Sequence, residues 1–127
     1  MGARILIVDA EPTVRTLVKK ILEKAGHDVR VAGDLPSALK AIEIGLPDLV
    51  LTNVYLPGVT GHDAIRSLKE AAPATPILMI SGLPDHETID RWKDEDGWDV
   101  FPKPFAPEAL VRKVAAVIDG SAKSAAR

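Results

Sequence analysis

The chain has 127 residues, of which 46% are hydrophobic and 27% charged, and its formal net charge is −2. This length suits one compact domain, and the composition is that of an ordinary globular protein, not of a disordered or fibrous one. The small negative charge provides no broad basic surface, so we expect no nucleic-acid partner. The absence of cysteine excludes disulfides, thiolate catalysis and thiolate metal sites.

The first apolar run, residues 5–8, is too short for a signal peptide or a membrane span, and Asp9 interrupts it. We therefore expect no membrane association and a cytoplasmic location.

Five short runs rich in Ile, Leu and Val alternate with five helix-like segments, which predicts a parallel sheet covered by helices on both faces. The first, third and fourth runs are continuously apolar, as expected of central strands, whereas the second contains Asp-Val-Arg-Val and alternates like an edge strand. The predicted strands are residues 5–8, 29–32, 49–52, 77–80 and 100–101.

The first predicted helix begins near Pro12 and ends at Gly26. Its apolar stripe consists of Val14, Leu17, Val18, Ile21, Leu22 and Ala25. The second helix follows Asp34, a good N-cap residue, and ends by Gly45.

The third helix lies between Gly61 and Pro73, and the fifth opens with Pro107. The fourth, at about residues 85–94, has only Ile89 and Trp92 as apolar anchors, so we expect it to be mobile or to face a partner.

Right-handed crossovers between five such units predict an α/β fold with a flavodoxin-like, doubly wound five-stranded parallel sheet, strand order 2-1-3-4-5, and five helices. We expect residues 1–119 to form the domain. Residues 120–127, GSAKSAAR, are small and polar, which predicts a flexible tail or the start of a linker.

Four polar residues follow predicted strands and would meet at the carboxyl edge of the sheet, where open α/β folds bind ligands. They are Asp9, Asn53, Ser81 and Lys103. Taken singly, each has a structural explanation. Asp9 or the nearby Glu11 could cap a helix, and the other three could be turn residues.

The segments ILIVDAEP, LVLTNVYLPGVTG, ILMISG and FPKPF resemble the receiver domains of response regulators, over roughly residues 4–119. The resemblance implies a role in two-component phosphorelay signalling. It also implies that Asp9 belongs to an acidic pair that binds Mg²⁺, and that Ser81 and Lys103 are the residues that bind the phosphoryl group, Ser81 being the switch hydroxyl.

Two positions depart from the family pattern. Ala10 stands where the resemblance implies a metal-coordinating carboxylate, and Asn53 stands where it implies the aspartate that accepts phosphate. A neutral amide is not a nucleophile for phosphorus. We therefore expect no cofactor and no Mg²⁺ unless the site is restored; any metal would have only Asp9, Asn53 and the main chain of Tyr55. Glu11 belongs to the acidic pocket but points away from the metal in the family pattern.

The sequence favours a pseudo-receiver that is not an enzyme and acts as a protein-interaction module. Its partner would be a histidine kinase, another receiver or an output domain, with a homodimer possible through the face of the fourth helix, fifth strand and fifth helix. The alternative is an ordinary Asp-phosphorylated, Mg²⁺-dependent receiver with an engineered change to Asn53. A flavodoxin-like cofactor-binding protein is the third reading, although DAEPTV lacks a hydroxyl-rich phosphate loop.

Overall fold

The computed structural model describes residues 2–53, 58, 61–81, 99–102 and 106–125. Five strands in these ranges form one parallel sheet with the order β2-β1-β3-β4-β5, which is the order expected from the sequence. The strands are β1 (Arg4–Val8), β2 (Asp28–Ala32), β3 (Leu49–Asn53), β4 (Ile77–Ser81) and β5 (Asp99–Pro102). The three continuously apolar runs are therefore the central strands, and the alternating run is an edge.

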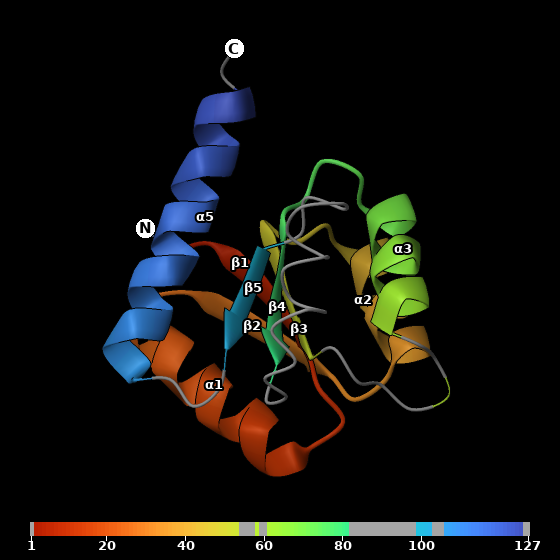
Figure 1. The fold of residues 1–127 in the computed structure, drawn as a ribbon, viewed down its shortest axis with the longest axis horizontal. Helices are drawn as coiled ribbons and strands as arrows, with labels where there is room; N and C mark the ends of the chain where they lie inside the picture. Colours follow the sequence, from red (N-terminus) through yellow and green to blue (C-terminus); the bar gives the residue numbers. More distant parts are fainter. Residues whose placement is uncertain (1, 54–57, 59–60, 82–98, 103–105, 126–127) are drawn as a thin grey trace.

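Helices cover both faces of the sheet (Figure 1). The helices α1 (Pro12–Lys24) and α5 (Pro107–Ala125) lie on one face, and α2 (Leu35–Ile44) and α3 (Gly61–Ala71) lie on the other. The helix expected at about residues 85–94 falls outside the described residues. Among the helices that are described, none combines the length and hydropathy needed to cross a bilayer.

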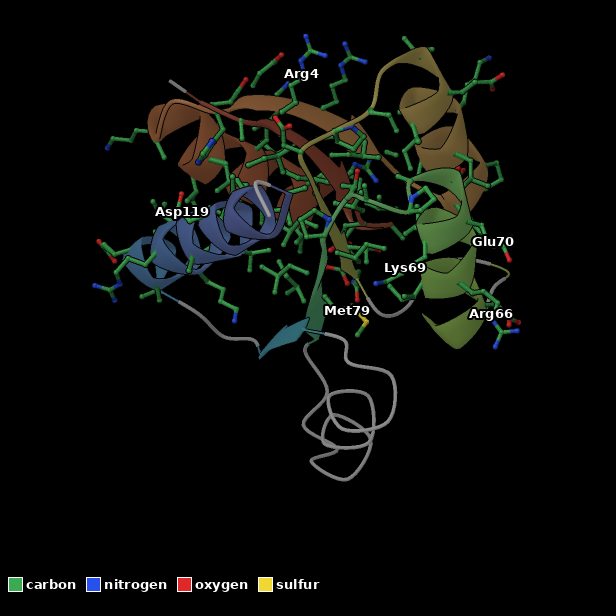
Figure 2. All side chains as sticks on the ribbon, turned by 90° about the horizontal axis from the view of Figure 1, so that it is seen from above. Arg4, Arg66, Lys69, Glu70, Met79 and Asp119 are labelled. Carbon is green, nitrogen blue, oxygen red and sulfur yellow. The ribbon has the colours of Figure 1, made fainter. Side chains whose placement is uncertain are left out.

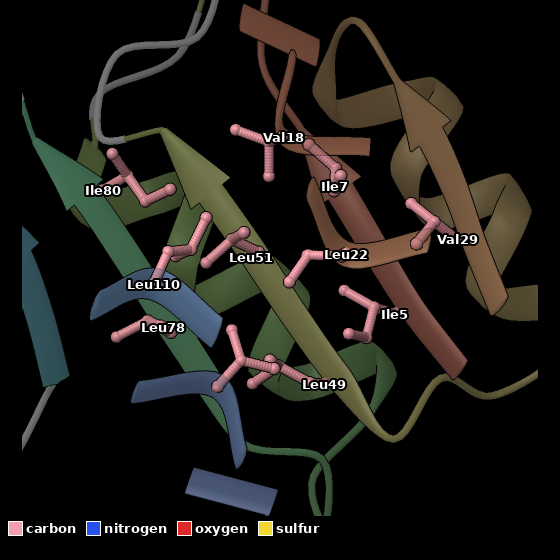
Figure 3. Close-up of a cluster of buried hydrophobic side chains, with 11 residues drawn as sticks. Ile5, Ile7, Val18, Leu22, Val29, Leu49, Leu51, Leu78, Ile80 and Leu110 are labelled. Atoms are coloured by element: carbon pink, nitrogen blue, oxygen red, sulfur yellow. The ribbon is translucent and has the colours of Figure 1, made fainter. Parts of the chain in front are cut away.

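The sheet separates two hydrophobic cores because successive side chains of a strand point to opposite faces. One core contains alternate residues of β1, β3 and β4 packed on α1 and α5 (Figure 3). The other contains the intervening residues, such as Leu6, Val8 and Val50, packed on α2 and α3. The first core consists of Ile5, Ile7, Val18, Leu22, Val29, Leu49, Leu51, Leu78, Ile80, Leu110 and Val114.

Two helix boundaries follow from local chemistry. The carboxylate of Asp34 accepts a hydrogen bond from the Ser37 N–H at 2.8 Å, so it caps α2 as predicted. After α1, Gly26 adopts a φ of +98°, a conformation that glycine reaches without strain. The charged side chains of Arg66 and Glu70 on α3 lie on the outer surface, as Figure 2 shows.

Two details differ from the sequence prediction. Leu17 was expected in the buried stripe of α1, yet it is 54% exposed, because Val18 and Leu22 point most directly at the sheet and Leu17 lies to one side of them. The structure also continues α5 to Ala125, into the segment predicted to be a flexible tail or the start of a linker. Gly120 only weakens a helix, and the alanines that follow it favour one. A linker role for residues 120–127 stays a prediction.

Candidate functional site

The side chains of Asp9 and Asn53 meet at the carboxyl edge of the sheet. Asn53 ends β3 and Asp9 follows β1, and these strands pair with Val8 opposite Thr52. The amide Nδ2 of Asn53 donates a hydrogen bond to Oδ2 of Asp9 at 3.3 Å. Because a carboxylate only accepts hydrogen bonds, the amide presents its nitrogen to Asp9.

Asp9 is held from several other directions and is only 3% exposed. Its Oδ1 accepts from the Glu11 N–H at 2.9 Å, a side-chain-closed turn typical of aspartate. Its own N–H donates to the carbonyl oxygen of Ala32 at 3.0 Å, which extends the pairing of β1 with β2. Its carbonyl oxygen accepts from Nη1 of Arg15 at 2.6 Å. The Asp9 carboxylate is therefore fixed in position.

The other residues singled out from the sequence are placed less completely. Ala10 and Glu11 are both exposed, and Glu11 occupies the N-cap position of α1 without a side-chain capping bond. Ser81 is the last residue of β4, whose Ile80 lies opposite Asn53, so Ser81 reaches the same edge of the sheet. Lys103 and Tyr55 lie outside the described residues.

The described residues form a poor metal site. Within the described ranges, no three side chains of Asp, Glu, His or Cys come together in a way that could hold a metal ion. At this edge Asp9 is a buried carboxylate, but its neighbours Ala10 and Asn53 supply a methyl group and a neutral amide. Mg²⁺ prefers hard oxygen ligands and is usually held by carboxylates. This donor set does not fit Mg²⁺.

Thr52 neighbours Asn53 in β3 but belongs to the opposite face of the sheet. It is completely buried, and its hydroxyl donates to the carbonyl oxygen of Asn53 at 3.0 Å. This burial leaves the hydroxyl inaccessible to a phosphodonor.

Sequence reasoning missed Arg15 and Gly33. Arg15 lies in the first turns of α1, where a basic residue normally indicates only a solvated helix face. Gly33 lies between β2 and α2 and reads as an ordinary loop glycine. The one available signal was that a long side chain six residues after Asp9 can reach back over the start of the helix.

A second feature is an open, largely apolar groove between α1 and α5, with a volume of about 590 Å³. Ile21, Ala25 and Val111 contribute apolar surface, and the exposed Leu17 lies nearby in a hollow that shares Lys20 with the groove. The groove is lined by Lys20, Ile21, Lys24, Ala25, Pro107, Glu108, Val111 and Arg112. Three of these residues are basic and one is acidic, although the whole chain carries a net charge of −2.

Comparison with known families agrees with this architecture. Residues 5–115 match the family described as "Response regulator receiver domain". The chain belongs to this family. Membership in this family makes the chain a receiver domain of the two-component response-regulator type. It argues against the alternative of a flavodoxin-like cofactor-binding protein.

Receiver domains of longer proteins are among its relatives. The chain is 33% identical over 110 residues to the DNA-binding transcriptional regulator NtrC of Rhizobium meliloti, covering 87% of this chain and 23% of that protein. It is 36% identical over 116 residues to the DNA-binding response regulator MtrA of Mycolicibacterium smegmatis, covering 91% of this chain and 50% of that protein. This receiver thus spans half or less of these relatives.

Two solved structures contain the same fold. NtrX from Brucella abortus superimposes with a TM-score of 0.89 at 34% identity, covering 98% of this chain and 28% of that one. A CheY-like receiver domain protein from Methanospirillum hungatei JF-1 superimposes with a TM-score of 0.86 at 27% identity, covering 98% of this chain and 99% of that one.

Proposed function

We propose that this receiver domain acts in two-component signalling as an interaction module whose state does not depend on phosphorylation at residue 53, and that it is not an enzyme. The observation that carries the proposal is the hydrogen bond from Asn53 Nδ2 to Asp9 Oδ2. The amide at the expected acceptor position is already bonded to the acidic residue expected to help hold a metal.

The chemistry of the two substituted positions supports this proposal. The amide of Asn53 has no negative charge, and its nitrogen lone pair is delocalised, so it cannot attack phosphorus. The side chain of Ala10 offers no oxygen to a metal ion. Phosphoryl transfer depends mainly on positioning and on charge stabilisation by cations. The acceptor and a carboxylate of the metal site are therefore missing together.

Electrostatics favour an amide at position 53 in this site. A carboxylate there would place an oxygen where the nitrogen now lies, 3.3 Å from Asp9 Oδ2. Two unit charges at this separation repel by on the order of 5 kcal/mol at an effective dielectric constant of about 20. A bound cation would offset the repulsion of an aspartate at position 53, whereas Asn53 makes its hydrogen bond without one.

The groove between α1 and α5 supports a role in protein binding. Its apolar surface with Lys20, Lys24 and Arg112 along it is complementary to an amphipathic helix with acidic residues. We infer that the partner presents such a helix as part of a histidine kinase, another receiver or an output domain. The homodimer expected through the face of residues 85–94, β5 and α5 remains a separate proposal, because residues 85–94 are not described.

Intact-mass analysis tests the phosphorylation proposal. The chain, Asn53→Asp and Ala10→Asp/Asn53→Asp are each incubated with Mg²⁺ and a small-molecule phosphodonor, beside an ordinary receiver as a positive control. We expect only the double variant and the control to gain a phosphoryl group. Phosphate on the unmodified chain would contradict the proposal, and efficient phosphorylation of Asn53→Asp alone would favour an ordinary receiver changed at one position.

Charge reversal tests the groove separately. Affinity for purified dimerisation domains of histidine kinases is measured for the chain, for Lys20→Glu/Lys24→Glu, and for Arg66→Glu/Lys69→Glu on α3 as a control with the same charge change on the other face. We expect the groove variant to lose at least about tenfold in affinity and the control to bind like the parent. Equal losses in both variants would indicate a general charge effect and no docking in the groove.

A further inference from the structure

Arg15 connects two loops at the edge of the sheet. Its Nη1 donates to the carbonyl oxygen of Asp9 at 2.6 Å, so the side chain reaches from α1 back to the loop that carries Asp9. The hydrogen bond is short and has a charged donor, which places it among the stronger hydrogen bonds of proteins. It acts on the main chain of Asp9 and leaves both carboxylate oxygens for other partners.

Gly33 provides the space for this guanidinium. A Cβ atom built on Gly33 would lie 2.9 Å from Nη1 of Arg15, closer than real Cβ atoms come to another heavy atom. Any side chain at position 33 would therefore push the guanidinium away. The loop between β2 and α2 is thus shaped to receive Arg15, next to Ala32, whose carbonyl oxygen accepts the Asp9 N–H.

The main chain of Asp9 is consequently held on both sides, by Ala32 at its N–H and by Arg15 at its carbonyl oxygen. These two bonds fix where its side chain begins. The carboxylate then accepts from the Glu11 N–H and from Nδ2 of Asn53. The 3.3 Å bond to Asn53 is the longest of the four, so it should respond most to a small shift of the Asp9 main chain.

We propose that Arg15 is a positioning residue which, seated in the space left by Gly33, sets the orientation of the Asp9 carboxylate toward residue 53. It acts through the Asp9 peptide and does not touch residue 53. The inference concerns the geometry of the site and holds whether or not residue 53 accepts phosphate, so it is independent of the proposed function. Lysine is a poor replacement because its ammonium lacks the planar, forked donors of arginine.

Nuclear magnetic resonance of the Asn53 side-chain NH₂ group tests this proposal directly. The variants are Arg15→Met, which keeps an apolar stem, and Gly33→Ala, which displaces the guanidinium and leaves both Arg15 and Asp9 in the sequence. Thr16→Ala, on the exposed surface of the same helix, is the control. Urea unfolding of each variant gives the global stability.

We expect Arg15→Met and Gly33→Ala to shift the Asn53 NH₂ resonances in the same direction. Hydrogen exchange of the Asn53 NH₂ group should become faster by on the order of tenfold in both variants, beyond what the change in global stability explains. This is the effect expected for the loss of one charge-assisted hydrogen bond. Thr16→Ala should leave both properties unchanged. Unchanged Asn53 resonances in Arg15→Met would overturn the proposal and leave Arg15 a purely structural role. If Arg15→Met does not fold, Gly33→Ala decides in the same way, and an unaffected Asn53 in that variant overturns the proposal.

Discussion

Asn53 and Asp9 are joined side chain to side chain across the neighbouring central strands β1 and β3, with 3.3 Å between Nδ2 and Oδ2. Asp9 is almost completely buried, and Asn53 is half-buried. A buried carboxylate is stable only when hydrogen bonds or charges compensate its lost hydration. In this receiver a neutral amide supplies part of that compensation, which makes residue 53 a contributor to stability as well as a candidate signalling position.

Replacing Asn53 by aspartate should destabilise the protein in the absence of metal. The change removes a hydrogen bond to a buried carboxylate and adds a like charge beside it, so we expect the free energy of unfolding to fall by about 1 to 3 kcal/mol. Urea unfolding in the presence of a chelator measures this. Asn53→Ala removes the hydrogen bond without adding charge and should cost less; an equal or larger loss in Asn53→Ala would show that repulsion is unimportant.

Mg²⁺ should stabilise the receiver only when carboxylates are introduced at positions 10 and 53. A metal that binds the folded state raises the melting temperature in proportion to the logarithm of its concentration above Kd. We expect millimolar Mg²⁺ to leave the melting temperature of the parent chain unchanged and to raise that of Ala10→Asp/Asn53→Asp. Differential scanning calorimetry with and without Mg²⁺ decides this, and a clear increase for the parent would contradict the poor donor set described for Asp9, Ala10 and Asn53.

Asp34 should make stability depend on pH in the acid range. The Ser37 main-chain N–H, followed by the Ser37 side chain, holds the pKa of Asp34 below its ordinary value of 3.8. Because the pKa is lower in the folded state, the stabilisation is fully present above pH 3.8 and is lost as the pH falls through the folded-state pKa. Asp34→Ala should therefore melt at a lower temperature at pH 7, and this difference should shrink at pH 2 to 3. A constant difference across this range would show that charge plays no part in the cap.

Leu110 should be far more sensitive to truncation than Ile44. Leu110 of α5 is fully buried in the core shared with α1, whereas Ile44, at the end of α2, is 73% exposed. Leu110→Ala should cost about 2 to 5 kcal/mol because it leaves a cavity. Ile44→Ala should change stability by no more than about 0.5 kcal/mol. Urea unfolding of the two variants side by side measures the contrast, and similar costs would contradict the packing described here.

Gly26 offers a measurement of backbone strain alone. It has a φ of +98°, and a Cβ atom added to it would meet no other atom within 4 Å. Gly26→Ala should therefore lower stability by about 1 kcal/mol through conformation alone, without a steric clash. Gly26→Asn should cost less, because asparagine tolerates this conformation better than alanine does. Thermal unfolding of both variants tests this order.

Much of the architecture could be predicted from the sequence because strand burial leaves a simple signal. Continuous apolar runs in β1, β3 and β4 indicated central strands, and the cap at Asp34 indicated the start of α2. The burial of Leu17 was predicted wrongly because the apolar stripe of α1 is wider than the part of the helix surface that packs on the sheet. The sequence left the end of α5 open because a glycine followed by alanines is only a weak stop.

The candidate site could be predicted less completely. Asp9 and Asn53 were expected to meet, because parallel strands deliver their carboxyl ends to one edge, and their side chains do meet. The contribution of Arg15 and Gly33 could not be predicted, because it depends on where a long side chain folds back and on the room left by an absent Cβ. Positions of Lys103 and Tyr55 stay predictions.

Successive side chains of β3 point to opposite faces of the sheet, and the core packing ends before residue 53. Leu51 and Thr52 are fully enclosed on opposite faces, while Asn53, one residue further, belongs to neither hydrophobic core. Replacing the side chain of residue 53 by one of similar size therefore leaves the packing of both cores unchanged. The same fold can therefore carry an amide or a carboxylate at this position, so structural likeness between receivers does not by itself show whether they are switched by phosphate.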